Sequence, residues 1–127
     1  MKKILISGDR SGAGKTSITV AIAAILSQKY TVQTFKVGMD YIDPSYLSAV
    51  TGRQCANLDS FVLSPDENKE IFDHACQGAD IAIIEGVRGL YEGAESLSDS
   101  GSTASIAKIL NVPVILVIDA RSITRSA

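Results

Sequence analysis

A glycine-rich segment near the start of the chain combines the residue types that bind nucleotide phosphates. Residues 8–17 read Gly-Asp-Arg-Ser-Gly-Ala-Gly-Lys-Thr-Ser and follow the short apolar run of residues 4–6. Gly12 and Gly14 allow the backbone to turn its N–H groups toward phosphate oxygens, because no Cβ stands in the way. A helix that begins near Lys15 would add the positive end of its dipole. This spacing is typical of a P-loop, and the alternative is an ordinary glycine-rich turn between a strand and a helix.

The residues of this loop have distinct expected roles. Lys15 would reach the β- and γ-phosphates, and the hydroxyl of Thr16 would ligate Mg²⁺. Gly8 lies one residue further from Gly14 than GxxxxGK[ST] requires, a longer form that occurs in a distinct branch of P-loop proteins. Arg10 could contact phosphate across a dimer, and a solvated loop charge is the alternative. The residues expected to bind nucleotide are Gly8, Arg10, Ser11, Gly12, Ala13, Gly14, Lys15, Thr16 and Ser17.

Acidic residues follow two further apolar runs. Glu85 ends the run of residues 81–84, and an acid at that position of a P-loop fold lies beside Mg²⁺, directly or through water. Asp40 and Asp43 lie three residues apart after a second apolar run, where two carboxylates near a triphosphate would repel unless a cation lay between them. The alternatives are a polar strand end for Glu85 and a helix cap for Asp43, and the cap is compatible with metal contact.

A second glycine-rich loop follows Glu85. Residues 87–93 read Val-Arg-Gly-Leu-Tyr-Glu-Gly, in which Arg88 offers a cation to a carboxylate or phosphate and Glu92 offers an acceptor. Ser102 lies in a Gly-Ser-Thr segment that opens a later helix and offers backbone N–H groups to an anion. The alternative for residues 87–93 is a flexible surface loop.

Strands and helices alternate in the elements that must position these residues. Apolar patterning predicts strands over residues 3–7, 31–37, 80–85 and 112–119, and helices over 16–28, 43–50, 65–77 and 102–110. Strands buried on both faces between helices predict an α/β fold with a parallel sheet and right-handed crossovers. Ligands of such folds bind at the carboxyl edge of the sheet, where the P-loop, Asp40, Asp43, Glu85 and Asp119 should meet.

Composition narrows the function classes. The 127 residues allow one domain at most, and a formal charge of −2 gives no support to nucleic-acid or membrane binding. Apolar stretches are too short to cross a bilayer, and the start does not read as a signal peptide, so we expect a cytoplasmic protein. Cys55 and Cys76 lack metal-binding spacing and read as reduced thiols, and His74 reads as structural.

Several segments together resemble the amino-terminal synthetase domain of the cobyrinic acid a,c-diamide synthases. The resemblance spans nearly the whole chain, and its most selective part is Lys-Val-Gly-Met-Asp-Tyr-Ile-Asp-Pro at residues 36–44. Residues 87–93 are similar to the nickel-sirohydrochlorin a,c-diamide synthases of methanogens. Four residues differ from those usual in the family, namely Met39, Glu92, Arg88 and Arg10. These differences leave the expected ATP site intact and the identity of the tetrapyrrole open. The matching segments are residues 8–16, 35–44, 51–53, 57–59, 84–87, 89–91 and 101–104.

This resemblance implies ATP-dependent amidation of the a- and c-acetate groups of a tetrapyrrole through acyl phosphates. By matching position, Lys15, Asp40, Asp43 and Glu85 are implied to be catalytic, and Thr16, Asp43 and Glu85 to hold Mg²⁺. Substrate contact is expected from Arg88, Tyr91, Glu92 and Ser102.

Family members carry a carboxyl-terminal glutaminase domain that supplies ammonia, and neither cysteine of this chain has the strand-to-helix setting of its nucleophile. We therefore expect an incomplete P-loop synthetase domain over residues 1–127, of about four strands, which alone would use free ammonia at most. Exposed sheet edges would encourage self-association, so a homodimer is one expected assembly.

Three alternatives remain open at this point. A dethiobiotin-synthetase-like or cobyric-acid-synthase-like ligase shares the P-loop and the acids but should lack the run of residues 37–44. A partitioning-type ATPase that dimerises on ATP has Arg10 as its one hint. A folded piece without activity of its own is the third alternative, and the fold alone does not separate the three.

Overall fold

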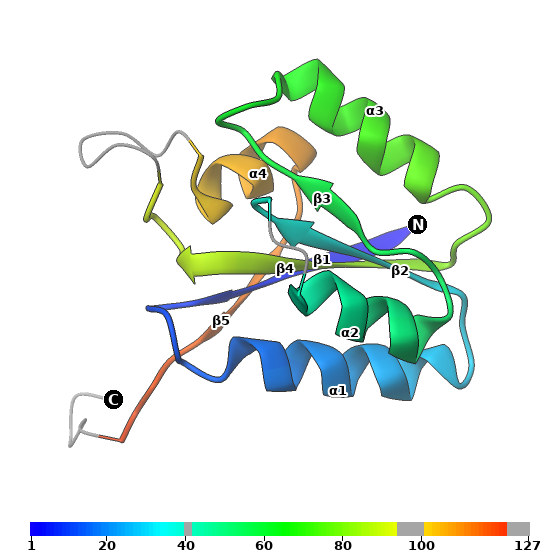
Figure 1. Cartoon of the computed structure of the whole chain (residues 1–127), viewed down its shortest axis with the longest axis horizontal. Coiled ribbons are helices and arrows are strands. Elements are labelled where there is room, and N and C mark those ends of the chain that lie inside the picture. The colour runs from blue at the N-terminus through cyan, green and yellow to red at the C-terminus, as the bar shows by residue number, and fades with distance from the viewer. Residues whose placement is uncertain (40–41, 94–100, 122–127) are drawn as a thin grey trace.

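The computed structural model describes residues 1–39, 42–93 and 101–121, with the side chain of Asp43 outside the described part. Strands and helices alternate along these ranges, as the sequence predicted (Figure 1). The elements are β1 (Lys2–Gly8), α1 (Lys15–Ser27), β2 (Val32–Val37), α2 (Ile42–Thr51), β3 (Ala56–Leu58), α3 (Pro65–Ala75), β4 (Ile81–Gly89), α4 (Thr103–Leu110) and β5 (Val114–Val117).

The strands form one parallel sheet in the order β3-β2-β4-β1-β5. Helices α1 and α2 cover one face, and α3 and α4 cover the other (Figure 1). Right-handed crossovers explain this division. Helices α1 and α2 each connect a strand to one that lies nearer the β3 edge of the sheet, whereas α3 and α4 connect strands in the opposite direction. The predicted α/β fold with a parallel sheet is therefore confirmed.

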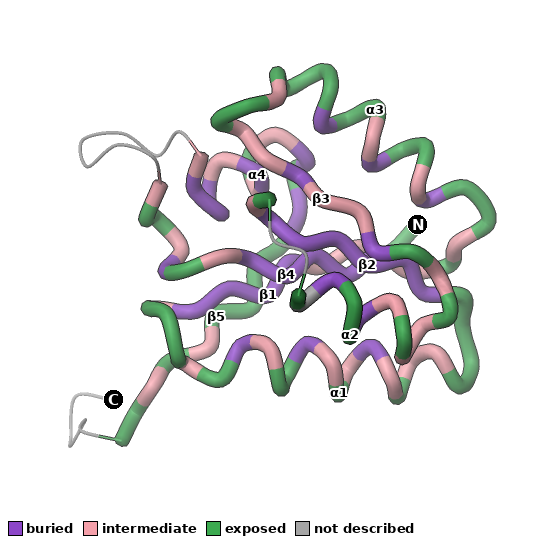
Figure 2. The backbone as a smooth tube through the Cα atoms, in the orientation of Figure 1, coloured by how far each residue is buried: buried purple, intermediate pink, exposed green. Residues whose placement is uncertain are grey.

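Each face of the sheet has its own apolar core, and the central strands are buried between them (Figure 2). The core under α3 and α4 contains Leu5, Phe35 and Ile84 with Phe72 of α3. The core under α1 and α2 contains Ile6, Val32 and Ile83 with Ala23 of α1 and Leu47 of α2. Alternate residues of each strand thus face opposite layers, which fixes the face toward which every polar strand residue points.

Two expectations about the sheet were wrong. The short strand β3 was not predicted, because three residues are too few to show a periodic pattern, yet it pairs with β2 from Phe35 to Val37. We expected the apolar strand at residues 112–119 to be buried on both faces. Val114, Ile115 and Leu116 of β5 are instead exposed, because β5 forms the edge of the described sheet.

Local signals explain most helix boundaries. Ser64 and Glu67 form the predicted capping box of α3, and Ser102 caps α4 by accepting a hydrogen bond from the N–H of Ser105. Helix α2 begins at Ile42, so Asp43 and Pro44 lie in its first turn and not at the cap that the sequence suggested. None of the helices in the described ranges has the length and hydropathy that a bilayer crossing requires.

Candidate functional site

The loop between β1 and α1 has the backbone conformation of an anion-binding turn. Gly12 and Gly14 have φ angles of 78° and 92°, in the left-handed region that favours glycine. Gly14 is the N-cap of α1, which has neither a side-chain cap nor an acidic residue in its first turn. Helices α3 and α4, in contrast, are capped by Ser64 and Ser102. The first N–H groups of α1 therefore face a site where an anion would be favourable.

Backbone hydrogen bonds hold this loop against its neighbours. The N–H of Asp9 donates to the carbonyl of Val117 at 3.0 Å, and the N–H of Leu90 donates to the carbonyl of Gly8, also at 3.0 Å. A Cβ at Gly8 would lie 2.9 Å from the carbonyl oxygen of Arg10, so glycine is required there by close approach. The loop is thus tied to β5 and to the segment after β4, which brings residues from three strands to one place.

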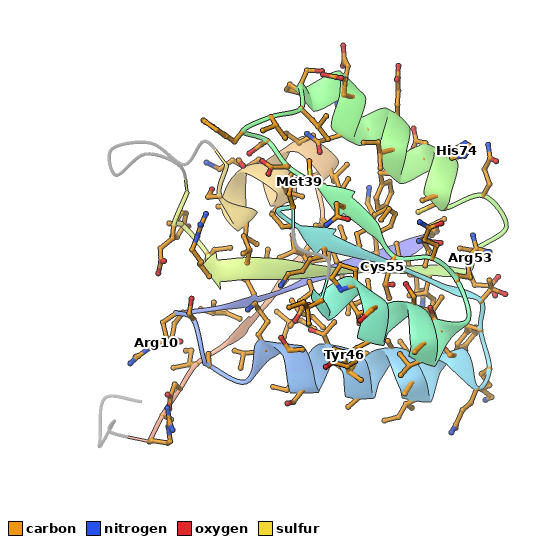
Figure 3. All side chains as sticks on the ribbon, viewed as in Figure 1. Arg10, Met39, Tyr46, Arg53, Cys55 and His74 are labelled. Carbon is orange, nitrogen blue, oxygen red and sulfur yellow. The ribbon has the colours of Figure 1, made fainter. Side chains whose placement is uncertain are left out.

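Cationic residues of the loop differ in their surroundings. Lys15 is buried at the start of α1, on the helical side that faces the sheet. Arg10 is exposed, and its guanidinium forms an ion pair with Asp9 at 3.0 Å (Figure 3). This pairing fits the solvated loop charge that the sequence left open for Arg10.

Glu85 lies at the P-loop end of the sheet, as predicted. It pairs in register with Ile6 of β1 on one side and with Lys36 of β2 on the other. Register neighbours share a face, and Ile6 packs in the core under α1 and α2. Glu85 and Lys36 therefore point toward the layer in which Lys15 begins α1.

A buried lysine accompanies Glu85. The Nζ of Lys36 lies 3.4 Å from Oε2 of Glu85 and donates a hydrogen bond to the carbonyl oxygen of Gly86 at 2.9 Å. The two side chains are 2% and 0% exposed. Sequence reasoning assigned no role to Lys36; the signal that could have found it is its place at the start of the selective run of residues 36–44, whereas its burial is visible only in the structure.

The carboxylate of Glu85 fits the metal-binding role that the sequence suggested. Within the described part of the chain, both of its oxygens are buried without a hydrogen-bond partner, and Lys36 forms an ion pair with Oε2. Among the described residues, no group of three His, Cys, Asp or Glu side chains could hold a metal ion by itself.

The other two predicted acids are less defined. Asp40 lies outside the described residues, and so does the side chain of Asp43. The backbone of Asp43 lies in the first turn of α2, which follows the carboxyl end of β2. The segment that carries both acids therefore starts from the same edge of the sheet as the P-loop.

The loop after β4 borders a cavity of about 670 Å³ next to the P-loop. Its lining includes Asp9, Arg88, Tyr91, Glu92 and Leu116. Three of the four predicted substrate residues are thus brought together beside the nucleotide loop. The fourth, Ser102, is fully buried and caps α4 with its hydroxyl.

Close backbone approaches shape the last residues of β4 and the loop that follows them. A Cβ at Gly86 would lie 2.6 Å from Cγ2 of Thr103. The hydroxyl of Thr103 accepts a hydrogen bond from the N–H of Val87 and donates one to the carbonyl oxygen of the same residue. A Cβ at Gly89 would lie 2.8 Å from Oε1 of Glu92, so this carboxylate folds over the backbone. Arg88 has a φ of 51°, an uncommon conformation for a residue with a side chain. Arg88 is exposed, so its backbone conformation is less favourable than that of a glycine at the same φ.

The two cysteines and the histidine were given no catalytic role from the sequence, and their surroundings in the structure fit that interpretation. Cys55 and Cys76 are buried free thiols, and burial raises the pKa of each to about 11. Neither is ionised near neutral pH, so neither is a ready nucleophile. His74 is exposed at the amino edge of the sheet, far from Arg10 (Figure 3). Asp119 is at the carboxyl edge, where hydrogen bonds from Arg121 lower its pKa to about 2.

Known proteins resemble this chain over its whole length. The model of the CobQ/CobB/MinD/ParA nucleotide binding domain family matches residues 4–125. A cobyrinate a,c-diamide synthase of Methanosarcina barkeri is 61% identical over 98% of the chain and 26% of its own length. Proteins of that name from Methanobrevibacter smithii and Methanocaldococcus jannaschii are 54% and 50% identical over 98% and 100% of the chain. The chain spans only 28% and 29% of these two relatives.

Proposed function

Because this chain belongs to the family of CobQ/CobB/MinD/ParA nucleotide-binding domains, with the fold of P-loop NTPases, we propose that it is the ATP-binding part of a carboxylate–amine ligase. The proposed full-length enzyme amidates the a- and c-acetate groups of a tetrapyrrole. The observation that carries this proposal is the uncapped start of α1 on the same sheet edge as buried Glu85. The names of the similar proteins, at 50–61% identity, support the tetrapyrrole as substrate.

ATP phosphates would bind in the β1–α1 loop. The backbone N–H groups of residues 12–16 would surround the β-phosphate, and the ammonium of Lys15 would neutralise charge on the β- and γ-phosphates. Gly12 and Gly14 support this role because their left-handed conformations turn N–H groups inward without a Cβ. We propose that the rest of the nucleotide contact comes from Gly8, Arg10, Ser11, Ala13 and Ser17.

Mg²⁺ would be held by Thr16, Asp43 and Glu85. The Glu85 carboxylate supports this assignment, since it is buried, pairs with Lys36 and has no hydrogen-bond partner within the described residues, so it can accept a further cation. When bound, Mg²⁺ supplies charge neutralisation of the phosphates during transfer. Asp40 is proposed as a further catalytic acid of the same site.

The proposed reaction has two steps. An oxygen of the acetate carboxylate attacks the γ-phosphorus of ATP, the bond between that phosphorus and the β–γ bridging oxygen breaks, and ADP leaves. Ammonia then attacks the acyl carbon, the C–O bond to the phosphate breaks, and the amide forms with loss of a proton. Activation is needed because a carboxylate has no good leaving group. Lys15 would stabilise the negative charge that develops on the transferred phosphoryl group.

The tetrapyrrole would approach from the cavity after β4. Arg88 offers a guanidinium to a substrate carboxylate, while Tyr91 and Glu92 line the same cavity. Ser102 would contribute by fixing the start of α4 beside that loop. We propose cobyrinate as the substrate from the names of the relatives, with nickel-sirohydrochlorin as the second compound to be tested.

Ammonia would come from a part of the protein beyond this chain. The relatives extend over more than three times the matched length, which leaves room for a glutaminase domain. The buried, protonated thiols of Cys55 and Cys76 support the view that glutamine is not hydrolysed within the described part. A homodimer is a compatible assembly.

Nucleotide binding is tested by calorimetry with ATP and Mg²⁺. Lys15→Ala should weaken ATP binding by about 100-fold or more, because one charge-assisted contact to two phosphates is lost. Lys29→Ala is the matched control, since Lys29 is exposed in the turn just after the far end of the same helix. Equal ATP affinity in both variants would contradict the nucleotide site.

The reaction is tested by incubating the full-length protein with ATP, Mg²⁺, glutamine and either cobyrinate or nickel-sirohydrochlorin. Mass spectrometry should show one compound lose about 2 Da as two carboxyl groups become amides, since each OH is replaced by NH₂. ATP hydrolysis that neither compound stimulates, together with ATP-dependent dimerisation, would instead favour a partitioning-type ATPase.

A further inference from the structure

A second cavity lies at the ends of β2, β3 and β4. We propose that it binds one edge of the macrocycle, with hydrocarbon against Met39 and Phe61 and a peripheral carboxylate at Arg88. This inference rests on the proposed function, because it concerns the substrate of that same site.

The cavity is built from segments that are far apart in the sequence. It has a volume of about 380 Å³ and is lined by Met39 after β2, by Asp59 and Phe61 after β3, and by Val87 and Arg88 of β4. Ligand pockets usually measure about 300–1,000 Å³, so this one suits part of a large flat ligand better than the whole. It therefore fits an edge of the macrocycle.

Two large apolar side chains of this cavity face solvent. Phe61 is 63% exposed and Met39 is 49% exposed. Single exposed apolar residues are common on protein surfaces, but here two converge on one concave site beside Val87. Aromatic and thioether side chains both pack well against flat conjugated or partly saturated rings. Figure 3 shows Met39 at the carboxyl end of β2, toward the layer of α3 and α4.

Hydrogen bonds hold Phe61 in its exposed position. Its backbone N–H donates to Oδ1 of Asp59 at 2.7 Å, and the N–H of Asp59 donates to Oδ1 of Asn68 at 3.0 Å. Asn68 is fully buried and donates from Nδ2 to the carbonyl oxygens of Asp59 and Ser64. The turn is therefore anchored to α3, so the exposed ring is presented by an ordered segment.

Charge in the cavity suits an acidic ligand. Arg88 lines both this cavity and the larger one beside the P-loop, so its guanidinium can serve a carboxylate in either. Asp59 also lines the cavity, but its carboxylate accepts the hydrogen bond from Phe61 and forms part of the turn. The cavity lining reaches Val87, two residues after Glu85 along β4, so a macrocycle edge in this cavity would lie beside the strand that carries the proposed metal ligand.

The test compares two adjacent residues that are exposed to a similar extent. Phe61 lines the cavity, whereas Val62 is 56% exposed and does not. In the full-length enzyme, Phe61→Ala should raise the KM for the macrocycle about 10-fold, since it removes an aromatic contact. The KM for ATP should change less than about twofold, because the nucleotide site is separate. Phe61→Trp should keep a KM near that of the unchanged enzyme, and Val62→Ala should do the same.

Outcomes separate this inference from the proposed function. If neither macrocycle is amidated by the unchanged enzyme, the proposed function fails and the inference falls with it. If amidation occurs but Phe61→Ala and Met39→Ala match Val62→Ala in macrocycle KM, the inference alone is overturned. Circular dichroism of each variant would show that the fold is kept, as expected for exposed positions. Equal rises in the KM for ATP and for the macrocycle would also contradict it.

Discussion

Lys36 and Glu85 form a buried ion pair, with 3.4 Å between Nζ and Oε2, across the adjacent strands β2 and β4. Lys36 also donates to the carbonyl of Gly86, so the pair is fixed at the point where β4 leaves the core. Burying two charges costs free energy that is regained only when both partners are present. The pair therefore fixes the position of the Glu85 side chain on the strand next to the nucleotide loop.

Removing one member of this pair should lower the free energy of unfolding more than removing both members. Lys36→Met should lower the free energy of unfolding by about 3–5 kcal/mol, because the Glu85 carboxylate is left buried and unpaired. The double variant Lys36→Met with Glu85→Gln should recover a large part of that loss, measured by urea denaturation. Additive losses in the double variant would show that the two side chains are not coupled. Both variants should lose ATP-dependent turnover.

Gly86 is expected to tolerate no side chain. Gly86→Ala should cost about 2–3 kcal/mol, because the new Cβ would lie 2.6 Å from Cγ2 of Thr103 and 3.3 Å from the carbonyl oxygen of Ile6. Adding Thr103→Ser should restore part of the loss, about 1 kcal/mol, since it removes Cγ2 and keeps the hydroxyl. Thermal denaturation measures both, with Thr103→Ser alone as control. A Gly86→Ala protein as stable as the unchanged one would contradict this close approach.

Two substitutions of Arg88 should separate the effect of backbone strain on stability from the effect of the guanidinium on substrate binding. Arg88→Gly should be more stable than Arg88→Ala by about 1 kcal/mol, because glycine adopts a φ of 51° without steric cost. Both variants lose the guanidinium, so in the full-length enzyme the macrocycle KM should rise by a similar factor of about 10. Denaturant titration and steady-state kinetics give the two readouts. If the macrocycle KM instead rises more in the less stable of the two variants, a direct contact between Arg88 and the macrocycle would be contradicted.

The buried thiol of Cys55 should make stability depend on alkaline pH. Burial raises its pKa from 9.0 to about 11, against a smaller opposing effect of the nearby Thr34 hydroxyl. Since the folded pKa is raised, this stabilising contribution is complete below about pH 9 and is lost as the pH rises toward 11.

Unfolding free energies at about pH 8 and about pH 10.5 test this effect, because the slope is at most about 1.4 kcal/mol per pH unit for one group. Cys55→Ala should lose less stability over that range than the unchanged chain. Other groups titrate there in both proteins, so the difference between them isolates the thiol. Equal losses would mean that Cys55 is ionised in the folded state.

Much of the fold and the nucleotide loop could be predicted because their signals are local. A left-handed turn needs glycine at Gly12 and Gly14, and a capping box needs Ser64 and Glu67 three residues apart. Apolar runs predicted the strands that occupy the centre of the sheet. The same local logic failed for β3, which exists because β2 offers it a partner and not because of its own three residues.

The sequence by itself determined the phosphate loop, the alternation of helices with all strands except β3, and the acid that follows the apolar run of residues 81–84. Tertiary structure alone decided that β2 lies beside β4, which brings Lys36 to Glu85 across 49 positions, and that Met39 and Phe61 face one cavity. The reason is physical. Backbone turns and caps depend on neighbours within a few residues, whereas strand order depends on which apolar faces the whole chain can bury together.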